Sequence, residues 1–191
     1  MSGASAYKED YAEYELINGE AYMMARPSVR HWRVASNIIG IFKNHLKGKR
    51  CQAFGEVDVH LSEKDNVVPD AMIVCNPDII EDDGIHGAPD LVVEVLSAST
   101  AKRDRVEKLQ LYEKYGVKEY WIVNPYGKSV DVYHLTDGKL ELAEAHQYFA
   151  EEKFKWMNEE IRAAALEQKL IKVSLCEDFI VELKDVFEDV D

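Results

Sequence analysis

The chain combines helical and extended hydrophobic patterns. Apolar residues recur every three or four positions from Ser28 to about Leu46, which predicts a helix. Residues 56–61 alternate between polar and apolar side chains, as a half-buried strand does. The runs 67–74 and 91–96 are almost wholly apolar, which is typical of central strands covered on both faces.

Two turn sequences predict hairpins. Asn18-Gly19 separates two short segments and predicts a hairpin over residues 14–24, because both turn residues tolerate positive φ. Asp137-Gly138 predicts a second hairpin over residues 129–143. Between the hairpins, a helix from Thr100 to Tyr115 follows the apolar run 91–96 and precedes a strand at 119–123.

These elements predict one α/β domain over residues 1–191, with a core at about 14–135. A central mixed β-sheet is expected to be flanked by helices, with the N-terminal hairpin beside it. Residues 151–169 predict a charged helix that forms a peripheral C-terminal addition.

Composition places the chain among ordinary soluble globular proteins, with 47% hydrophobic and 31% charged residues. No stretch approaches the roughly 18 consecutive apolar residues of a membrane-spanning helix. The N-terminus lacks the apolar segment of a secretory signal, so a cytoplasmic location is predicted. Cys51, Cys75 and Cys176 are odd in number and widely spaced, which predicts buried free thiols in a reducing cytoplasm rather than structural zinc.

The formal net charge of -13 argues against DNA binding by the whole surface, because phosphate neutralisation supplies most of the affinity of general DNA binders. A local basic patch on the surface is compatible with this net charge. The basic residues gather in three groups: Arg26, Arg30 and Arg33; Lys43, Lys47, Lys49 and Arg50; and Lys102, Arg103 and Arg105. Each group is also explained by a solvated helix face or strand end.

Lys108 lies near the centre of the apolar side of the helix predicted from Thr100 to Tyr115. A lysine at such a position either extends its ammonium group to the surface or meets carboxylates inside. Asp104 lies one turn before it, so a purely structural ion pair at this spacing is the alternative.

Two carboxylates interrupt the apolar strands. Asp70 shares a strand face with Met72 and Val74, and Glu94 shares one with Val92 and Leu96. Carboxylates on neighbouring strands form a hard oxygen site suited to Mg²⁺ or Mn²⁺.

Glu56, on the preceding strand, is a candidate third carboxylate of this site. A cation there would polarise a phosphate oxygen and lower the pKa of a bound water. Lys108 would place the attacking water or stabilise the transition-state charge. These residues therefore indicate metal-assisted phosphodiester hydrolysis.

From about Tyr14 to Leu135, the chain resembles the Uma-type putative restriction endonucleases, a branch of the PD-(D/E)xK nuclease superfamily. The segments that carry the resemblance are residues 14–20, Pro27-Ser28 with His31, residues 55–59, Val68-Pro69-Asp70, residues 88–97, Asp104, Lys108 and residues 112–125.

The resemblance implies a restriction-endonuclease-like core with Asp70 and Glu94 as metal ligands. Leu96 stands two residues after Glu94, where the simplest superfamily pattern has a lysine. The resemblance therefore requires Lys108 to supply the ammonium group from the helix. Asp70, Glu94, Lys108 and Glu56 are the predicted catalytic residues, and Mg²⁺ or Mn²⁺ is the predicted cofactor.

His31 and Arg105 are predicted to contact substrate phosphates. His60 shares a strand face with Glu56 and Asp58 and is a weaker candidate for a place near the metal.

The sequence thus predicts a metal-dependent DNA endonuclease that acts as a homodimer, by analogy with nucleases that cut both strands. A non-catalytic nucleic-acid-binding or interaction module that keeps the fold is the alternative, and a hydrolase of another phosphodiester is a third interpretation. Metal binding that depends on Asp70 and Glu94 would distinguish the endonuclease from the non-catalytic module, because only the enzyme requires it.

Overall fold

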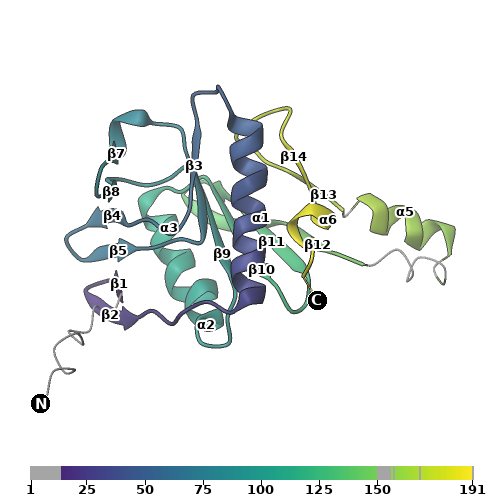
Figure 1. Ribbon diagram of the computed structural model, residues 1–191, viewed down its shortest axis with the longest axis horizontal. Coiled ribbons are helices and arrows are strands. Elements are labelled where there is room, and N and C mark those ends of the chain that lie inside the picture. The colour runs from purple at the N-terminus through teal and green to yellow at the C-terminus, as the bar shows by residue number, and fades with distance from the viewer. Residues whose placement is uncertain (1–13, 150–155, 157, 168, 191) are drawn as a thin grey trace, which may run out of the picture.

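The computed structural model describes residues 14–149, 156, 158–167 and 169–190 (Figure 1). The described residues contain two six-stranded sheets, and helices cover the larger, central sheet. The mixed α/β architecture predicted from the sequence is confirmed, including the N-terminal hairpin. None of the described helices has the length and apolar character needed to cross a membrane.

The central sheet has the strand order β12-β11-β10-β9-β6-β3. Strands β9 and β10 are parallel, and the other neighbouring pairs are antiparallel. The bounds are β3 Gln52–Phe54, β6 Ala71–Val74, β9 Leu91–Val95, β10 Glu119–Asn124, β11 Ser129–Thr136 and β12 Lys139–Gln147.

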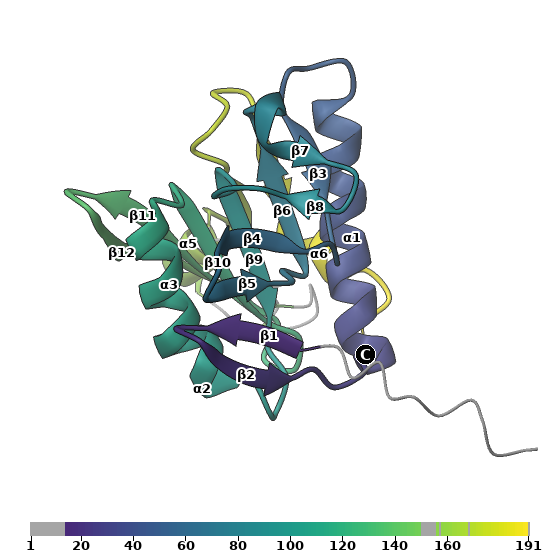
Figure 2. The ribbon, with the colours of Figure 1, turned by 90° about the vertical axis from the view of Figure 1, so that its left-hand side faces the viewer.

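The second sheet has the order β2-β1-β5-β4-β8-β7 and lies beside the central sheet (Figure 2). Its bounds are β1 Tyr14–Ile17, β2 Glu20–Met23, β4 Val59–Ser62, β5 Asp65–Val67, β7 Ile80–Glu81 and β8 Gly84–Ile85. The β1–β2 hairpin turns at Asn18 and Gly19, with φ values of 54° and 81°. These positive values explain the choice of Asn-Gly in a two-residue turn.

The longest helix is α1, Val29–Leu46, which Ser28 caps by accepting a hydrogen bond from the backbone N–H of His31. The crossover between β9 and β10 consists of α2 Ala101–Arg103, a π-helical turn η2 Asp104–Lys108, and α3 Leu109–Tyr115. Gly116 ends this crossover helix with a φ of 77°, a left-handed conformation that glycine adopts readily. The short 3₁₀ helix η1 spans Pro77–Ile79.

The core is divided by the central sheet. On one face, α1 and the C-terminal residues pack against Ala71, Ile73 and Val93. On the other face, the crossover helix and the second sheet pack against Met72 and Val92. Alternate residues of the same strands therefore face two different cores, which explains why these strands are apolar throughout.

Two predicted strands differ from the structure. The run 67–74 is not one strand: β5 ends at Val67 in the second sheet and β6 begins at Ala71 in the central sheet. Asp70 lies just before β6, in the bend that takes the chain from one sheet to the other. The strand predicted from Glu56 begins only at Val59, and Glu56 has a φ of 55° that is incompatible with a regular strand.

The helix predicted from Thr100 to Tyr115 is present, but its regular periodicity is not. The π-helical turn changes the register of the side chains, and Val106, expected on the apolar side, is 42% exposed. Asp104 and Lys108, at the two ends of this turn, are both buried.

The C-terminal region is only partly as predicted. Within the predicted helix 151–169, the structure describes α5 Glu159–Glu167, which stands away from the sheets in Figure 1, while residues 151–155, 157 and 168 lie outside the described residues. The acidic tail contributes a two-stranded sheet and a helix that packs on α1: β13 Leu170–Lys172, β14 Ile180–Glu182 and α6 Leu183–Val186.

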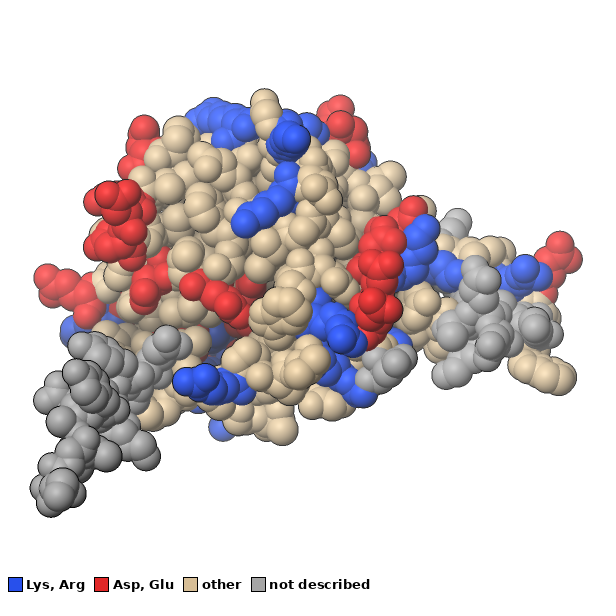
Figure 3. All heavy atoms as spheres, in the orientation of Figure 1, with Lys and Arg blue, Asp and Glu red and all other residues tan. Residues whose placement is uncertain are grey.

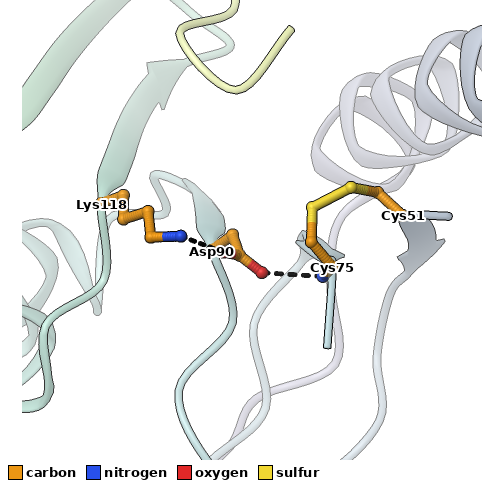
Figure 4. The surroundings of a disulfide bond; sticks show 4 residues. All are labelled: Cys51, Cys75, Asp90 and Lys118. Atoms are coloured by element: carbon orange, nitrogen blue, oxygen red, sulfur yellow. Dashed lines mark hydrogen bonds and ion pairs between the residues drawn. A yellow bond between two sulfur atoms is a disulfide. The ribbon is translucent and has the colours of Figure 1, made fainter. Parts of the chain in front are cut away.

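The prediction of free thiols is wrong for two of the three cysteines. Cys51 and Cys75 form a disulfide, and Cys176 is free (Figure 4). Antiparallel pairing of Gln52 with Val74 brings the two cysteines together from 24 residues apart, which sequence spacing does not reveal. The disulfide removes the cysteine argument for a reducing compartment.

Asp65 connects the second sheet to the crossover helix. Its carboxylate accepts hydrogen bonds from the backbone N–H of Asn18 at 2.6 Å, the hydroxyl of Tyr115 at 2.6 Å and the ammonium of Lys114 at 2.9 Å. Burial favours the neutral acid, but these three donors hold the pKa of Asp65 down, to about 2.

Because its pKa is lower in the folded state, Asp65 should stabilise the fold above about pH 4 and lose this contribution as the pH falls toward 2. The expected contribution is about 1 kcal/mol, since Lys114 is half exposed and screened. Urea unfolding of Asp65→Asn should show a lower stability at pH 7 and a flatter dependence between pH 5 and 2. A slope equal to that of the wild type would contradict this assignment.

The disulfide should stabilise the fold by about 3 kcal/mol, because it restricts the unfolded chain. Urea unfolding with and without dithiothreitol measures this difference. The Cys51→Ser/Cys75→Ser variant should match the reduced wild type and not respond to dithiothreitol, whereas Cys176→Ser should keep the response. Equal stabilities of the oxidised and reduced wild type would show that the bond contributes nothing.

Candidate active site

A buried ion pair joins the central sheet to the crossover helix. The ammonium Nζ of Lys108 lies 2.8 Å from Oε1 of Glu94, and both residues are less than 5% exposed. Glu94 points from β9 toward the core that includes the crossover helix, where Tyr112 also donates a hydrogen bond to Oε1 at 2.6 Å. The lysine beside Glu94 thus comes from the crossover helix, whereas Leu96 stands two residues after Glu94.

Glu15 is a third member of this cluster and was missed by the sequence reasoning. Its Oε1 lies 2.7 Å from Nζ of Lys108 and accepts a hydrogen bond from the backbone N–H of Val68. Arg103 lies 3.7 Å from the other oxygen. A signal was present: Glu15 shares the inward face of β1 with the buried Ile17, just as Glu94 interrupts an apolar strand.

Asp104 completes the surroundings of Lys108, with Oδ1 at 3.9 Å from Nζ. Asp104 and Lys108 are four residues apart, as the alternative of a structural ion pair predicted. Lys108 also contacts Glu15 and Glu94, however, so the pair with Asp104 is not isolated. Tyr120 donates a hydrogen bond to the backbone carbonyl of Asp104 at 2.9 Å, which fixes the π-helical turn against β10. Lys108 therefore meets carboxylates inside the protein instead of reaching the surface.

The electrostatics of the cluster follow from an excess of negative charge. Burial by itself would lower the pKa of Lys108, but Glu94, Glu15 and Asp104 raise it, so the lysine stays protonated. Burial raises the pKa of Glu94, and the neighbouring carboxylates raise it further against the effect of Lys108. Burial likewise raises the pKa of Asp104. The cluster is short of positive charge.

Asp70 lies at the edge of this cluster and faces solvent in part, with a side chain 15% exposed. Ala71 pairs with Val93, so the antiparallel register places Asp70 opposite Glu94. Its Oδ2 accepts a hydrogen bond from the backbone N–H of Val95 at 2.6 Å and lies 3.3 Å from Nε2 of His31. Asp70, just before β6, and Glu94, on the neighbouring strand β9, therefore lie opposite one another.

His31 reaches Asp70 from α1. Burial would lower the pKa of His31, but the hydrogen bond to Asp70 and the negative charge of its carboxylate raise it. Its Nδ1 is buried without a hydrogen-bond partner in the described part of the chain. A predicted substrate-binding residue thus contacts a predicted metal ligand.

The donor set fits a hard divalent cation. Within the described residues, Oδ1 of Asp70 and Oε2 of Glu94 have no protein hydrogen-bond donor, so each carboxylate keeps a free oxygen. Mg²⁺ is usually bound through one or two carboxylates with water in the remaining positions. The excess of negative charge around Glu94 also favours the binding of a divalent cation.

The other predicted site residues are not part of the buried cluster. Glu56 is exposed, and its backbone N–H donates to the carbonyl of Pro69, next to Asp70. Arg105 is exposed on the π-helical turn. His60 lies on β4 and contacts His86 rather than Asp70 or Glu94.

Basic side chains lie close to both ends of α1, and acidic ones gather on the side where β7 and β8 lie and also beside α1 where α6 lies (Figure 3). The N-terminal end of α1 carries Arg30, stacked on Tyr126 at 5.0 Å, one residue before His31. Arg103 stacks on the ring of Tyr22 at 4.2 Å. The acidic chain therefore has positive charge near Asp70.

Comparison with known proteins gives one family. The family model described as "Uma2: Putative restriction endonuclease" matches residues 5–157. The protein slr1290 of Synechocystis sp. is 30% identical over 129 residues, which cover 65% of this chain and 67% of that protein.

A crystal structure from Anabaena variabilis, described as a putative nuclease belonging to DUF820, has the same fold with a TM-score of 0.70. It is 21% identical in sequence, and the match covers 94% of this chain and 92% of that chain.

Removal of the buried ammonium should destabilise the protein strongly. Lys108→Met leaves Glu94 and Glu15 buried without their cation, for which the expected loss is about 3–5 kcal/mol at pH 7. The folded variant should hold a proton on Glu94, whose pKa is raised by burial, so its stability should rise as the pH falls from 8 to 5 relative to that of the wild type. Chemical denaturation at each pH measures both effects.

Lys102→Met, an exposed lysine on α2, is the matched control and should change stability by less than about 0.5 kcal/mol. A Lys108→Met protein as stable as this control would show that the cluster does not depend on the ammonium.

Proposed function

Because this chain belongs to the Uma2 family of putative restriction endonucleases, we propose that it hydrolyses phosphodiester bonds of DNA with the help of a divalent metal ion. Asp70 and Glu94 are the proposed metal ligands. The observation that carries the proposal is the 2.8 Å contact between Lys108 and Glu94, opposite Asp70. Through this contact the crossover helix provides a lysine beside Glu94, whereas the strand has Leu96 at the position where the simplest superfamily pattern has a lysine.

Asp70 and Glu94 would hold Mg²⁺ or Mn²⁺ through their free oxygens. Such an ion, when bound, polarises a phosphate oxygen and lowers the pKa of a water ligand. Lys108 orients the carboxylate of Glu94 through the 2.8 Å contact and would place the attacking water or stabilise the transition-state charge. Glu15 and Tyr112 hold Lys108 and Glu94 in this arrangement through the hydrogen bonds described above.

DNA would approach along the N-terminal end of α1, where positive charge lies near Asp70. His31, with its raised pKa, and the exposed Arg105 are the proposed phosphate contacts. Glu56 is proposed to assist from the bend beside Pro69, through a water rather than as a direct ligand, because its side chain is exposed.

A non-catalytic binding or interaction module is the second candidate. The burial of Lys108 favours it, since an ammonium engaged by three carboxylates also has a purely structural explanation. The net charge of -13 points in the same direction. A homodimer and a cytoplasmic location stay predictions; the exposed Met23 and Leu142 of the two hairpins are candidate dimer contacts.

Plasmid nicking tests the proposal. Supercoiled DNA should be cut in the presence of Mg²⁺ or Mn²⁺ and not in EDTA. Asp70→Asn and Glu94→Gln should each lower the rate by about 100-fold or more, because each removes a charged ligand without a change of volume. Asp78→Asn, an exposed aspartate in η1, is the matched control and should cut at the wild-type rate.

The outcomes separate the two candidates. Cutting that persists in both Asp70→Asn and Glu94→Gln would place the chemistry elsewhere. DNA binding without cutting under any metal condition, by a protein whose fold is verified by circular dichroism, would favour the module. Lys108→Arg keeps the positive charge but moves it. If the position of the ammonium matters for the reaction, this variant should cut plasmid more slowly than the wild type while its free energy of unfolding changes little.

A further inference from the structure

A second cluster of metal-binding side chains lies outside the proposed active site. His60, Asp83 and His86 each offer one ligand atom, and these atoms lie within 4.8 Å of one another. His60 belongs to β4, while Asp83 and His86 flank β8 in the β7–β8 hairpin. In the described part of the chain, this is the one group of three or more such residues at that separation.

The three side chains are arranged as ligands would be. Nε2 of His86 lies 2.9 Å from Oδ1 of Asp83, and the rings of His60 and His86 have centroids 4.6 Å apart. Nε2 of His60 is buried without a hydrogen-bond partner in the described residues. Buried polar atoms are nearly always paired, so an unpaired imidazole nitrogen beside two further donors is informative.

The backbone holds the hairpin against β4 at this point. The N–H of Ile85 donates to the carbonyl of Asp58 at 2.8 Å, and the N–H of His86 donates to that of Ile79 at 2.7 Å. Gly84 has a φ of 150°, and a Cβ there would lie 2.5 Å from the carbonyl oxygen of Asp58 and 3.1 Å from Nε2 of His60. Only glycine allows the hairpin to approach His60 this closely.

We propose that His60, Asp83 and His86 form a binding site for a divalent transition-metal ion of the Zn²⁺ class. Two imidazoles and one carboxylate suit Zn²⁺, Co²⁺ or Ni²⁺ better than Mg²⁺, which prefers oxygen. Three protein ligands leave a fourth position for water.

Ligand atoms on one tetrahedral Zn²⁺ lie about 3.3 Å apart, given bond lengths of about 2.0–2.1 Å. The observed atoms are within 4.8 Å, so a shift of roughly an ångström closes the site. Asp83 and His86 are exposed and have room for this movement, while His60 is fixed by its partial burial on β4. The acidic residues Glu81 and Asp82 on the same hairpin add attraction for a cation.

The site is independent of the proposed nuclease site. Asp70 and Glu94 lie at one end of the antiparallel pair β6–β9, and the segment with the β7–β8 hairpin connects the other ends of these strands. A metal bound there would brace the connection between the two strands against β4. The metal sites also differ in donor atoms, so the two can be tested separately.

Zn²⁺ binding should be measured by competition with a chromophoric chelator at pH 7.5. The starting protein is the full chain with Asp70→Asn, Glu94→Gln and Cys176→Ser, which removes the proposed nuclease ligands and the free thiol. One equivalent of Zn²⁺ should bind. His60→Ala and His86→Ala should each weaken binding by at least about 10-fold, as removal of an imidazole ligand requires.

His45→Ala is the matched control, because His45 is another histidine beside an aspartate, Asp178, but its ring stacks on Phe179 rather than lying beside an imidazole. It should bind Zn²⁺ like the starting protein. In NMR spectra, Zn²⁺ should shift the imidazole signals of His60 and His86 and leave that of His134 in place.

Absence of stoichiometric Zn²⁺ binding would overturn the proposal, as would binding that persists in both His60→Ala and His86→Ala. His60→Gln, which keeps a polar side chain, distinguishes lost ligation from lost folding, because it should fold and still fail to bind. Plasmid cutting by the chain with intact Asp70 and Glu94 is scored separately, so either site can fail alone.

Discussion

Much of this structure depends on the burial of one ammonium group in the protein interior. Lys108 can be buried only because Glu94, Glu15 and Asp104 surround it, and these carboxylates can be buried only because Lys108 is there. The cluster joins β9 of the central sheet, β1 of the second sheet and the crossover helix. Three segments distant in sequence are thereby held in one arrangement, beside the partly exposed Asp70.

The backbone at this lysine is irregular. The π-helical turn exposes Val106, which a regular helix would present to the core, while Asp104 and Lys108 at the two ends of the turn both face inward. Such turns are frequent at functional sites, because they exchange regular hydrogen bonding for the direction of a side chain. The hydrogen bond from Tyr120 to the carbonyl of Asp104 secures the turn. The irregular part of the helix and the buried cluster therefore coincide at Asp104 and Lys108.

The two candidate metal sites illustrate how donor chemistry separates functions within one fold. Carboxylates next to a buried lysine favour a hard cation and the hydrolysis of phosphate esters. The imidazoles of His60 and His86 with Asp83 favour a transition metal, on a hairpin that only Gly84 allows to approach β4. The hairpin belongs to the segment that connects β6 to β9, at the ends of these strands away from Asp70 and Glu94.

Sequence alone determined the elements with strong local signals: the α1 helix with its Ser28 cap, the Asn18-Gly19 hairpin, and the apolar strands interrupted by Glu94. It also indicated that Lys108 lies on an apolar face, because a charge there breaks a short-range periodicity. Only the tertiary structure decided that Glu15 joins Lys108, that Cys51 meets Cys75, and that His60 faces His86. These contacts depend on strand register and on the packing of two sheets, which arise from the whole chain; local spacing marks Glu15 as inward-facing but does not identify its partner.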